Sequence, residues 1–104
     1  MRKIGMSTRD GADGGRTIEL KGELSLEASP DVLECLRVEI DGAKALRIDL
    51  RDVTYIDSSG IAVLVQGYRL ALKKGTEFFL VAPSPQVRSV IELSQLQEFF
   101  KFEE

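Results

Sequence analysis

Residues 52–64, which read DVTYIDSSGIAVL, decide the fold because the hydrophobic pattern changes within them. The apolar piece 53–56 is typical of a strand, whereas from Ile61 onward apolar residues recur with the 3.6-residue period of a helix. The pattern places one stripe of side chains on the buried face of that helix: Ile61, Leu64, Val65, Tyr68 and Leu72. The stretch therefore predicts a strand, a turn of small polar residues and an amphipathic helix.

The same patterns, followed in both directions, predict alternating strands and helices. Strands are predicted at 4–9, 17–22, 46–51, 77–82 and 99–102. The third is followed by a second short apolar piece at 53–56, and the fourth should be buried on both faces. A helix is predicted from the Ser29 cap to Ile40, and another after Ser84, with an apolar stripe of Val87, Val90, Ile91 and Leu93. The order β-β-α-β-α-β-α-β predicts an α/β fold, an open mixed sheet with helices packed mainly on one face.

The turn at residues 57–60 admits two interpretations from the residues alone. Asp57 or Ser58 is suited to cap the helix, and Gly60 would let the helix approach the sheet closely. The same helix start also favours negative charge, so a phosphoryl group on a serine here would face the positive end of the helix dipole. Spacing alone does not separate a structural cap from a phosphate-bearing switch.

The composition is that of one ordinary soluble domain. The chain has 104 residues, of which 43% are hydrophobic and 30% charged, and we expect residues 1–104 to form a single domain. No apolar run approaches the ~18 residues that a membrane span needs. The net charge is −3 and neither sign forms a long run, which disfavours direct contact with nucleic acid. We therefore expect neither membrane insertion nor nucleic-acid binding.

The residue types also argue against catalysis. The chain has no histidine, which removes the commonest general base, the usual zinc ligand and the ordinary serine-hydrolase triad. Asp49, Asp52 and Asp57 are better interpreted as solvated acids than as a metal site, because no second cluster of oxygen donors accompanies them. The single cysteine, Cys35, falls within a helical pattern and suits a reducing, cytoplasmic location. We predict no catalytic residue, no metal and no cofactor.

Residues 52–64 closely resemble the signature of the STAS domain, a family that includes bacterial anti-sigma factor antagonists and the tails of sulfate transporters. Three further landmarks follow the family's order. They are LKGEL at 20–24, KG at 74–75 before a hydrophobic strand, and SPQVR at 84–88, at the start of the third predicted helix. Together the landmarks cover most of the chain from about residue 17.

The resemblance implies a non-enzymatic regulator of transcription that works by partner switching. In antagonists of this family, the serine directly after the aspartate is phosphorylated by a partner kinase, and here that serine is Ser58. The unphosphorylated form would bind an anti-sigma factor serine kinase, phosphorylation would dissociate the complex, and a phosphatase would reset it. The residues implied to contact the partner are Glu23, Ser25, Asp57, Ser58, Ser59 and Gly60.

Two departures from the antagonist pattern keep other functions open. Antagonists commonly have aspartate where this chain has Ser25, and many add a final helix beyond the position of Glu104. Both features occur in cytoplasmic STAS subunits of phospholipid- or toluene-type ABC transporters, which bind the transporter ATPase without needing a phosphorylation switch. A nucleotide- or lipid-binding STAS module is a third class. The aromatic pair Phe99 and Phe100 also leaves a homodimer open.

Overall fold

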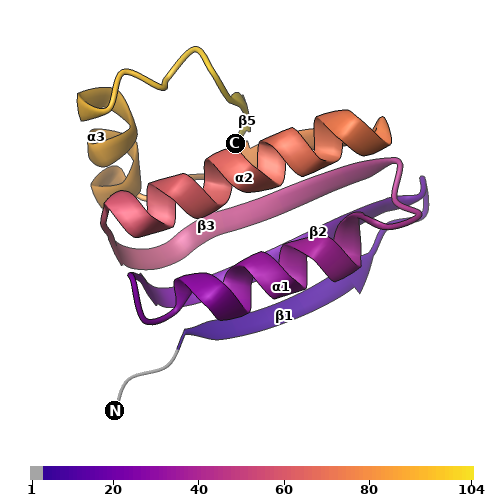
Figure 1. Ribbon diagram of the computed structural model, residues 1–104, viewed down its shortest axis with the longest axis horizontal. Coiled ribbons are helices and arrows are strands. Elements are labelled where there is room, and N and C mark those ends of the chain that lie inside the picture. Colours follow the sequence, from indigo (N-terminus) through magenta and orange to yellow (C-terminus); the bar gives the residue numbers. More distant parts are fainter. Residues whose placement is uncertain (1–3) are drawn as a thin grey trace.

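The computed structural model describes residues 4–104, which form five strands and three helices in the predicted order (Figure 1). The strands are β1 (Gly5–Asp10), β2 (Gly15–Leu24), β3 (Ala45–Ile56), β4 (Glu77–Val81) and β5 (Lys101–Glu103). The helices are α1 (Ser29–Ile40), α2 (Ser58–Lys74) and α3 (Pro85–Leu93). The first three residues of the predicted domain lie outside the described residues.

The sheet is mixed, with its strands in sequence order from β1 to β5. Strand β1 pairs antiparallel with β2, and the other neighbouring strands pair parallel. Each parallel connection moves one strand along in the same direction, so right-handed crossovers place their helices on the same face. Figure 1 shows α1 and α2 side by side across that face, with α3 at one end of the sheet. The predicted open mixed sheet, with helices mainly on one face, is confirmed.

A single core lies between the helices and the sheet. The largest fully buried side chains come from both layers, and they include Ile18, Leu20, Leu36, Leu46, Ile48, Leu50 and Leu64. Gly67 lets α2 lie close to its neighbours, because a Cβ there would sit 2.9 Å from Leu36 Cδ1 and 3.1 Å from Phe78 Cε1. The short connections and this close approach fix α1 and α2 against each other.

Strand β3 runs continuously through both apolar pieces at 46–51 and 53–56, which the predicted order counts as one strand. Its pairing with β2 shifts twice: Glu19 pairs with Asp49 but Lys21 with Asp52, and a second shift follows Gly22. Each shift adds an unpaired residue to β3, so Leu50 and Val53 both point into the core. The change of alternation between the two pieces is therefore a bulge, which interrupts the alternation of side chains without ending the strand.

Three details of the predicted helices were wrong. Leu72 and Leu93 were placed on buried faces, but their side chains are 67% and 85% exposed. Both lie near the C-terminal ends of their helices, where neither faces the core. Ser29 does not cap α1: the cap position is Ala28, and the Ser29 hydroxyl donates to the Ser25 carbonyl at 2.8 Å.

Strand β4 is buried on one face only, which corrects the prediction that both faces are covered. Phe78 and Leu80 are buried under the helices, whereas Phe79 and Val81 are half-buried on the opposite face. The Arg47 guanidinium lies 5.1 Å above the Phe79 ring and partly covers it. No helix needs to cover this face because long charged side chains shield the aromatic ring.

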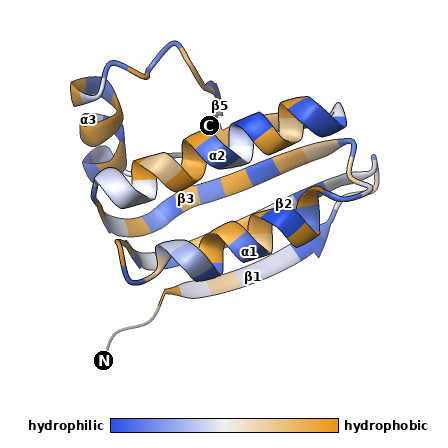
Figure 2. Ribbon diagram, viewed as in Figure 1, coloured by the Kyte–Doolittle hydropathy of each residue, from blue (hydrophilic) through white to orange (hydrophobic). Residues whose placement is uncertain are grey.

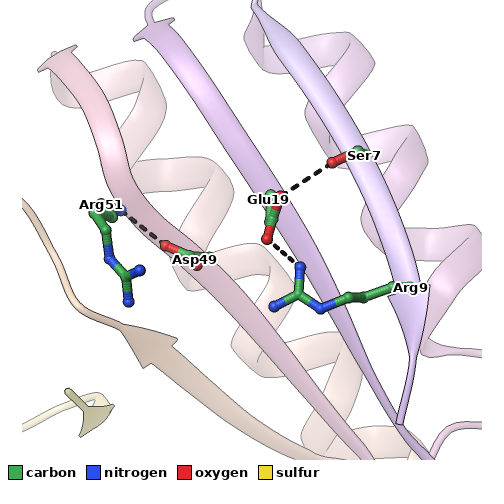
Figure 3. A network of polar contacts seen from close by, with 5 residues as sticks. All are labelled: Ser7, Arg9, Glu19, Asp49 and Arg51. Carbon is green, nitrogen blue, oxygen red and sulfur yellow. Dashed lines mark hydrogen bonds and ion pairs between the residues drawn. The ribbon is translucent and has the colours of Figure 1, made fainter.

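The helix-free face of the sheet carries a network of polar contacts (Figure 3). Glu19 accepts a hydrogen bond from Ser7 and forms an ion pair with Arg9 on the neighbouring strand. The contact with Arg9 holds the pKa of the Glu19 carboxyl below its ordinary value. Alongside, the Asp49 carboxylate accepts from the Arg51 backbone N–H at 3.0 Å. This face is therefore polar and internally paired over β1 and β2.

The last strand is shorter than predicted. It spans Lys101–Glu103 instead of 99–102, because Phe99 and Phe100 lie before it in an aromatic cluster with Tyr68. The Tyr68 and Phe99 ring centroids are 4.6 Å apart, and Phe100 is buried. Phe100 therefore belongs to the core, whereas Phe99 is 37% exposed and packs on Tyr68 of α2.

Candidate functional site

The Asp57 side chain organises the turn between β3 and α2. One carboxylate oxygen, Oδ1, accepts from the Gly60 backbone N–H at 3.1 Å and so caps α2. The other, Oδ2, accepts from the Leu26 backbone N–H at 3.3 Å. The predicted cap is thus confirmed for Asp57, and the same carboxylate also ties the β2–α1 loop to the start of α2.

Gly60 brings the first turn of α2 against the end of β2. A Cβ at this position would lie 2.4 Å from the Leu24 carbonyl oxygen and 2.7 Å from Ile56 Cγ1. The same Leu24 carbonyl accepts from the Asp57 N–H at 3.4 Å. A side chain at position 60 would therefore displace backbone, which confirms the close approach predicted for Gly60.

Ser58 is the first residue of α2, and its side chain is exposed. Ser59 beside it is half-buried. Within the described residues, neither hydroxyl forms a hydrogen bond to another side chain or to the backbone. The Ser58 hydroxyl is thus exposed and unbonded, at a helix terminus whose dipole favours negative charge.

The β2–α1 loop lies beside this turn. Ser25 is half-buried, and its carbonyl accepts from the Ala28 and Ser29 N–H groups at 3.1 and 3.0 Å, which closes the loop into a turn. Glu23, at the end of β2, is half-buried and pairs in register with Tyr55 of β3. All six predicted contact residues therefore lie at the same edge of the sheet, where β2 and β3 end.

Two exposed apolar residues at this edge were not predicted as part of the site. The Leu26 side chain is 71% exposed, one position after Ser25, and the Tyr55 side chain is 48% exposed. Leu26 could have been predicted from the sequence, because a large apolar residue in a loop indicates a contact surface. Tyr55 was missed because the register shifts in β3 decide which face of the sheet it occupies.

Helix α3 supports the site from the other side of β3. The buried Ser84 hydroxyl donates to the Val53 carbonyl at 2.6 Å and accepts from the Val87 N–H at 3.3 Å. The predicted Ser84 cap is confirmed, and its hydroxyl additionally anchors the end of β3. Asp57 and Ser84 therefore hold this end of the strand from two directions.

Other chemistry-bearing residues are dispersed. Among residues 4–104, no three histidine, cysteine, aspartate or glutamate side chains gather in a way that could hold a metal ion. Burial raises the pKa of the Cys35 thiol, which keeps it in the unreactive protonated form at neutral pH. None of the helices described is both long and apolar enough to cross a membrane.

Comparison with known proteins gives consistent similarities. A model of the STAS domain matches residues 4–104. A STAS-domain containing protein of Pseudomonas aeruginosa is 32% identical over 92 residues, covering 86% of this chain and 90% of that protein. The anti-sigma-B factor antagonist of Listeria monocytogenes is 29% identical over 85 residues, covering 81% and 75% of the two chains. An anti-sigma factor antagonist from Mycobacterium paratuberculosis, known from its crystal structure, matches with a TM-score of 0.86 and 30% identity, covering 96% of this chain and 85% of that one.

Proposed function

The chain belongs to the STAS domain family, and from this membership we propose that it is an anti-sigma factor antagonist switched by phosphorylation of Ser58. The unphosphorylated protein binds an anti-sigma factor serine kinase, and the phosphorylated protein is released from it. The observation that carries the proposal is the exposed, unbonded Ser58 hydroxyl at the start of α2, beside an aspartate whose carboxylate is already engaged. The similarity to two anti-sigma factor antagonists supports the same role.

The geometry explains why such a switch needs no refolding. The kinase would transfer the γ-phosphoryl group of ATP to Ser58 Oγ, the hydroxyl proton would leave, and ADP would be the second product. Because Asp57 already caps Gly60 and holds Leu26, the phosphate can be added outside an intact network. It adds a charge of roughly −1.5 to −2 at pH 7 next to the Asp57 carboxylate. A partner seated over this edge would then meet repulsion and a desolvation cost.

The partner surface combines the reacting hydroxyl with apolar contacts. Leu26 and Tyr55 are exposed at the edge where Ser58 lies. Exposed apolar side chains in the centre of an interface contribute most of its binding energy, whereas surrounding polar groups set register and specificity. We propose that the kinase buries Leu26 when it reaches Ser58, and that a phosphatase reverses the modification.

Phosphate transfer tests the switch directly. The protein is incubated with its cognate kinase and ATP, and the site is mapped by mass spectrometry. We expect one phosphate on Ser58 in the native protein and in Ser59→Ala, the matched control, and none in Ser58→Ala. Ser58→Asp should bind the kinase at least about tenfold more weakly than Ser58→Ala, because the added charge opposes docking. Phosphate on Ser59 instead, or equal binding of the two Ser58 variants, would contradict the proposal.

A second candidate function rests on the composition of the β2–α1 loop. With Ser25 and exposed Leu26, the loop offers a hydroxyl and an apolar side chain where antagonists commonly have an acid. This surface also suits the ATPase subunit of a phospholipid-type ABC transporter. That function predicts stable copurification with the ATPase, unaffected by Ser58→Ala and lost in Leu26→Asp. Copurification with a serine kinase alone would exclude it.

A further inference from the structure

An open groove runs between α1 and the second half of α2, away from the Ser58 turn. Its volume is about 410 Å³, and its lining consists of Leu33, Arg37, Gln66, Arg69, Leu70 and Lys73. The two leucines are half-buried, and the three cationic side chains are exposed. The groove therefore has an apolar floor and cationic rims contributed by both helices. Figure 2 shows that hydrophobic and hydrophilic residues are interspersed along the ribbons of α1 and α2.

The three cations of the groove have no partner within the described residues. Among residues 4–104, six other cations are ion-paired with carboxylates: Arg9, Arg16, Arg47, Lys74, Arg88 and Lys101. Arg37, Arg69 and Lys73 form neither an ion pair nor a side-chain hydrogen bond. No carboxylate lines the groove either. On a chain with a net charge of −3, this is a locally cationic surface suited to an anionic partner.

The shape and charge of the groove favour a helix as its occupant. An open cleft between two packed helices accepts the ridge of a third helix, whose apolar side chains would contact Leu33 and Leu70. Acidic residues flanking that ridge would reach the cations on both rims. A second copy of this chain fits poorly, because a symmetric contact would bring the same cations together. Three cations are also too few to hold nucleic acid on an acidic protein.

We propose that this groove is a second docking site, which binds an acidic amphipathic helix of a protein partner. The site is independent of the function proposed for Ser58. Gln66 and Lys73 lie 8 and 15 residues after Ser58 on the same helix, or about 12 and 22 Å along its axis. A helix in the groove and a kinase at the turn can therefore bind at the same time.

A designed peptide tests the groove without knowledge of the natural partner. The probe is a helix of about five turns with leucines on one stripe and glutamates on both flanks. The matched control peptide carries lysines in place of the glutamates. Binding is measured by fluorescence anisotropy at increasing salt, and the contact surface is mapped from backbone amide chemical shifts. We expect the acidic peptide alone to bind, with shifts concentrated at Leu33, Arg37, Arg69 and Leu70 and affinity falling as salt rises.

Two matched pairs of charge reversals distinguish the contribution of the groove cations to peptide binding from that of the net charge of the protein. Arg69→Glu/Lys73→Glu should weaken peptide binding by at least about tenfold. Lys21→Glu/Arg51→Glu makes the same change in net charge with two exposed cations of the sheet, and it should leave binding within about twofold. Circular dichroism and thermal unfolding verify that both variants fold. Equal losses in the two variants, shifts outside the groove, or no peptide binding would overturn the proposal. Binding of phosphatidylglycerol vesicles without binding of the peptide would overturn it in favour of a lipid surface.

Discussion

The two ends of α2 differ in how the rest of the molecule uses them. At the N-terminal end, Asp57 accepts from two backbone N–H groups and Gly60 lies against the Leu24 carbonyl. In the second half of the helix, Arg69 and Lys73 extend into solvent without partners among the described residues. The N-terminal end is fixed by contacts within the fold. Near the other end, Arg69 and Lys73 have no ion pair among the described residues, whereas Lys74 pairs with Asp41.

The difference shows how one helix can serve as both a scaffold and a binding surface. A hydroxyl that receives a phosphate needs fixed surroundings, so that the added charge acts on the partner and does not unfold the turn. A surface that attracts an acidic partner needs cations without ion pairs, because paired cations would have to break existing contacts before they bind the partner. Substitutions at each end should therefore have effects of very different size on the free energy of unfolding.

The largest expected effect is that of Gly60→Ala. The new Cβ would meet the Leu24 carbonyl at 2.4 Å, which backbone movement alone can relieve, so we expect a loss of about 3 kcal/mol or more in the free energy of unfolding. Gly67→Ala is the matched control in the middle of α2. Its Cβ would meet the buried side chains of Leu36 and Phe78 at 2.9 and 3.1 Å but no backbone atom, and the helix propensity of alanine offsets part of that cost, so we expect a smaller loss of about 1–2 kcal/mol. Urea unfolding of both variants measures the difference, and equal losses would refute the contrast.

Asp57→Ala should have the next largest effect. It removes the cap of α2 and the bond to the Leu26 N–H together, for an expected loss of about 1–2 kcal/mol. Asp57→Asn keeps one oxygen acceptor and should lose about half as much. Amide hydrogen exchange gives an independent readout, because the Leu26 N–H should lose protection in Asp57→Ala. Unchanged protection at Leu26 would mean that the carboxylate does not hold the loop.

A carboxylate added at either end of α2 should change the free energy of unfolding by a smaller amount, with opposite signs of the dipole interaction at the two ends. At the N-terminus, Ser58→Asp places negative charge at the positive end of the dipole, and the nearby Asp57 opposes part of the gain. In the last turn, Lys73→Glu replaces a favourable charge with an unfavourable one and should cost about 0.3–1 kcal/mol. We therefore expect Ser58→Asp to unfold at or above the midpoint of Lys73→Glu in thermal unfolding. The reverse order would indicate that repulsion from Asp57 outweighs the dipole.

The smallest effect on the free energy of unfolding is expected outside α2, at the exposed ion pair between Arg9 and Glu19. Arg9 holds the Glu19 pKa below its ordinary value of 4.5, so the ionised carboxylate stabilises the fold at pH above that value. The contribution is lost as the pH falls through the lower pKa of the folded state. Glu19→Gln should therefore be slightly less stable than the native protein near neutral pH, and the difference should shrink as the pH falls below 4.5. A stability difference that grows on acidification would contradict this assignment.

Local patterns predicted the order of elements, and they failed where distant segments decide the outcome. Ser84 was predicted as a cap and Asp57 as one of two candidates, because a cap depends on residues within one turn of the helix. Ser29 was assigned the same role, but the β2–α1 loop places Ala28 at the cap and turns the Ser29 hydroxyl toward Ser25. Residue type therefore predicted a helix cap correctly only where the preceding loop does not shift the start of the helix to another residue.

Burial was harder to predict than secondary structure. Leu72 fits the apolar stripe of α2 by spacing, yet it is 67% exposed because the buried face of the last turn is centred on Ala71, and Leu72 lies at the margin of that face. Phe79 stands in an apolar run that resembles a strand covered on both faces, yet its face lies opposite the helices, and only the side chains of Arg47 and Lys101 lie over its ring. Spacing tells which residues share a face, but it does not tell whether anything covers that face.

Local sequence patterns were enough to predict the alternation of strands and helices, the small polar turn at residues 57–60 and the cap candidates within it. Periodicity and capping suffice for these features because they act over a few neighbouring residues. Only the tertiary structure decided that Leu26 bonds to Asp57, that β3 runs unbroken through its bulges, and that α1 and α2 form a cationic groove. These features depend on contacts between segments far apart in the chain, and the packing of the helices on the sheet determines which segments meet.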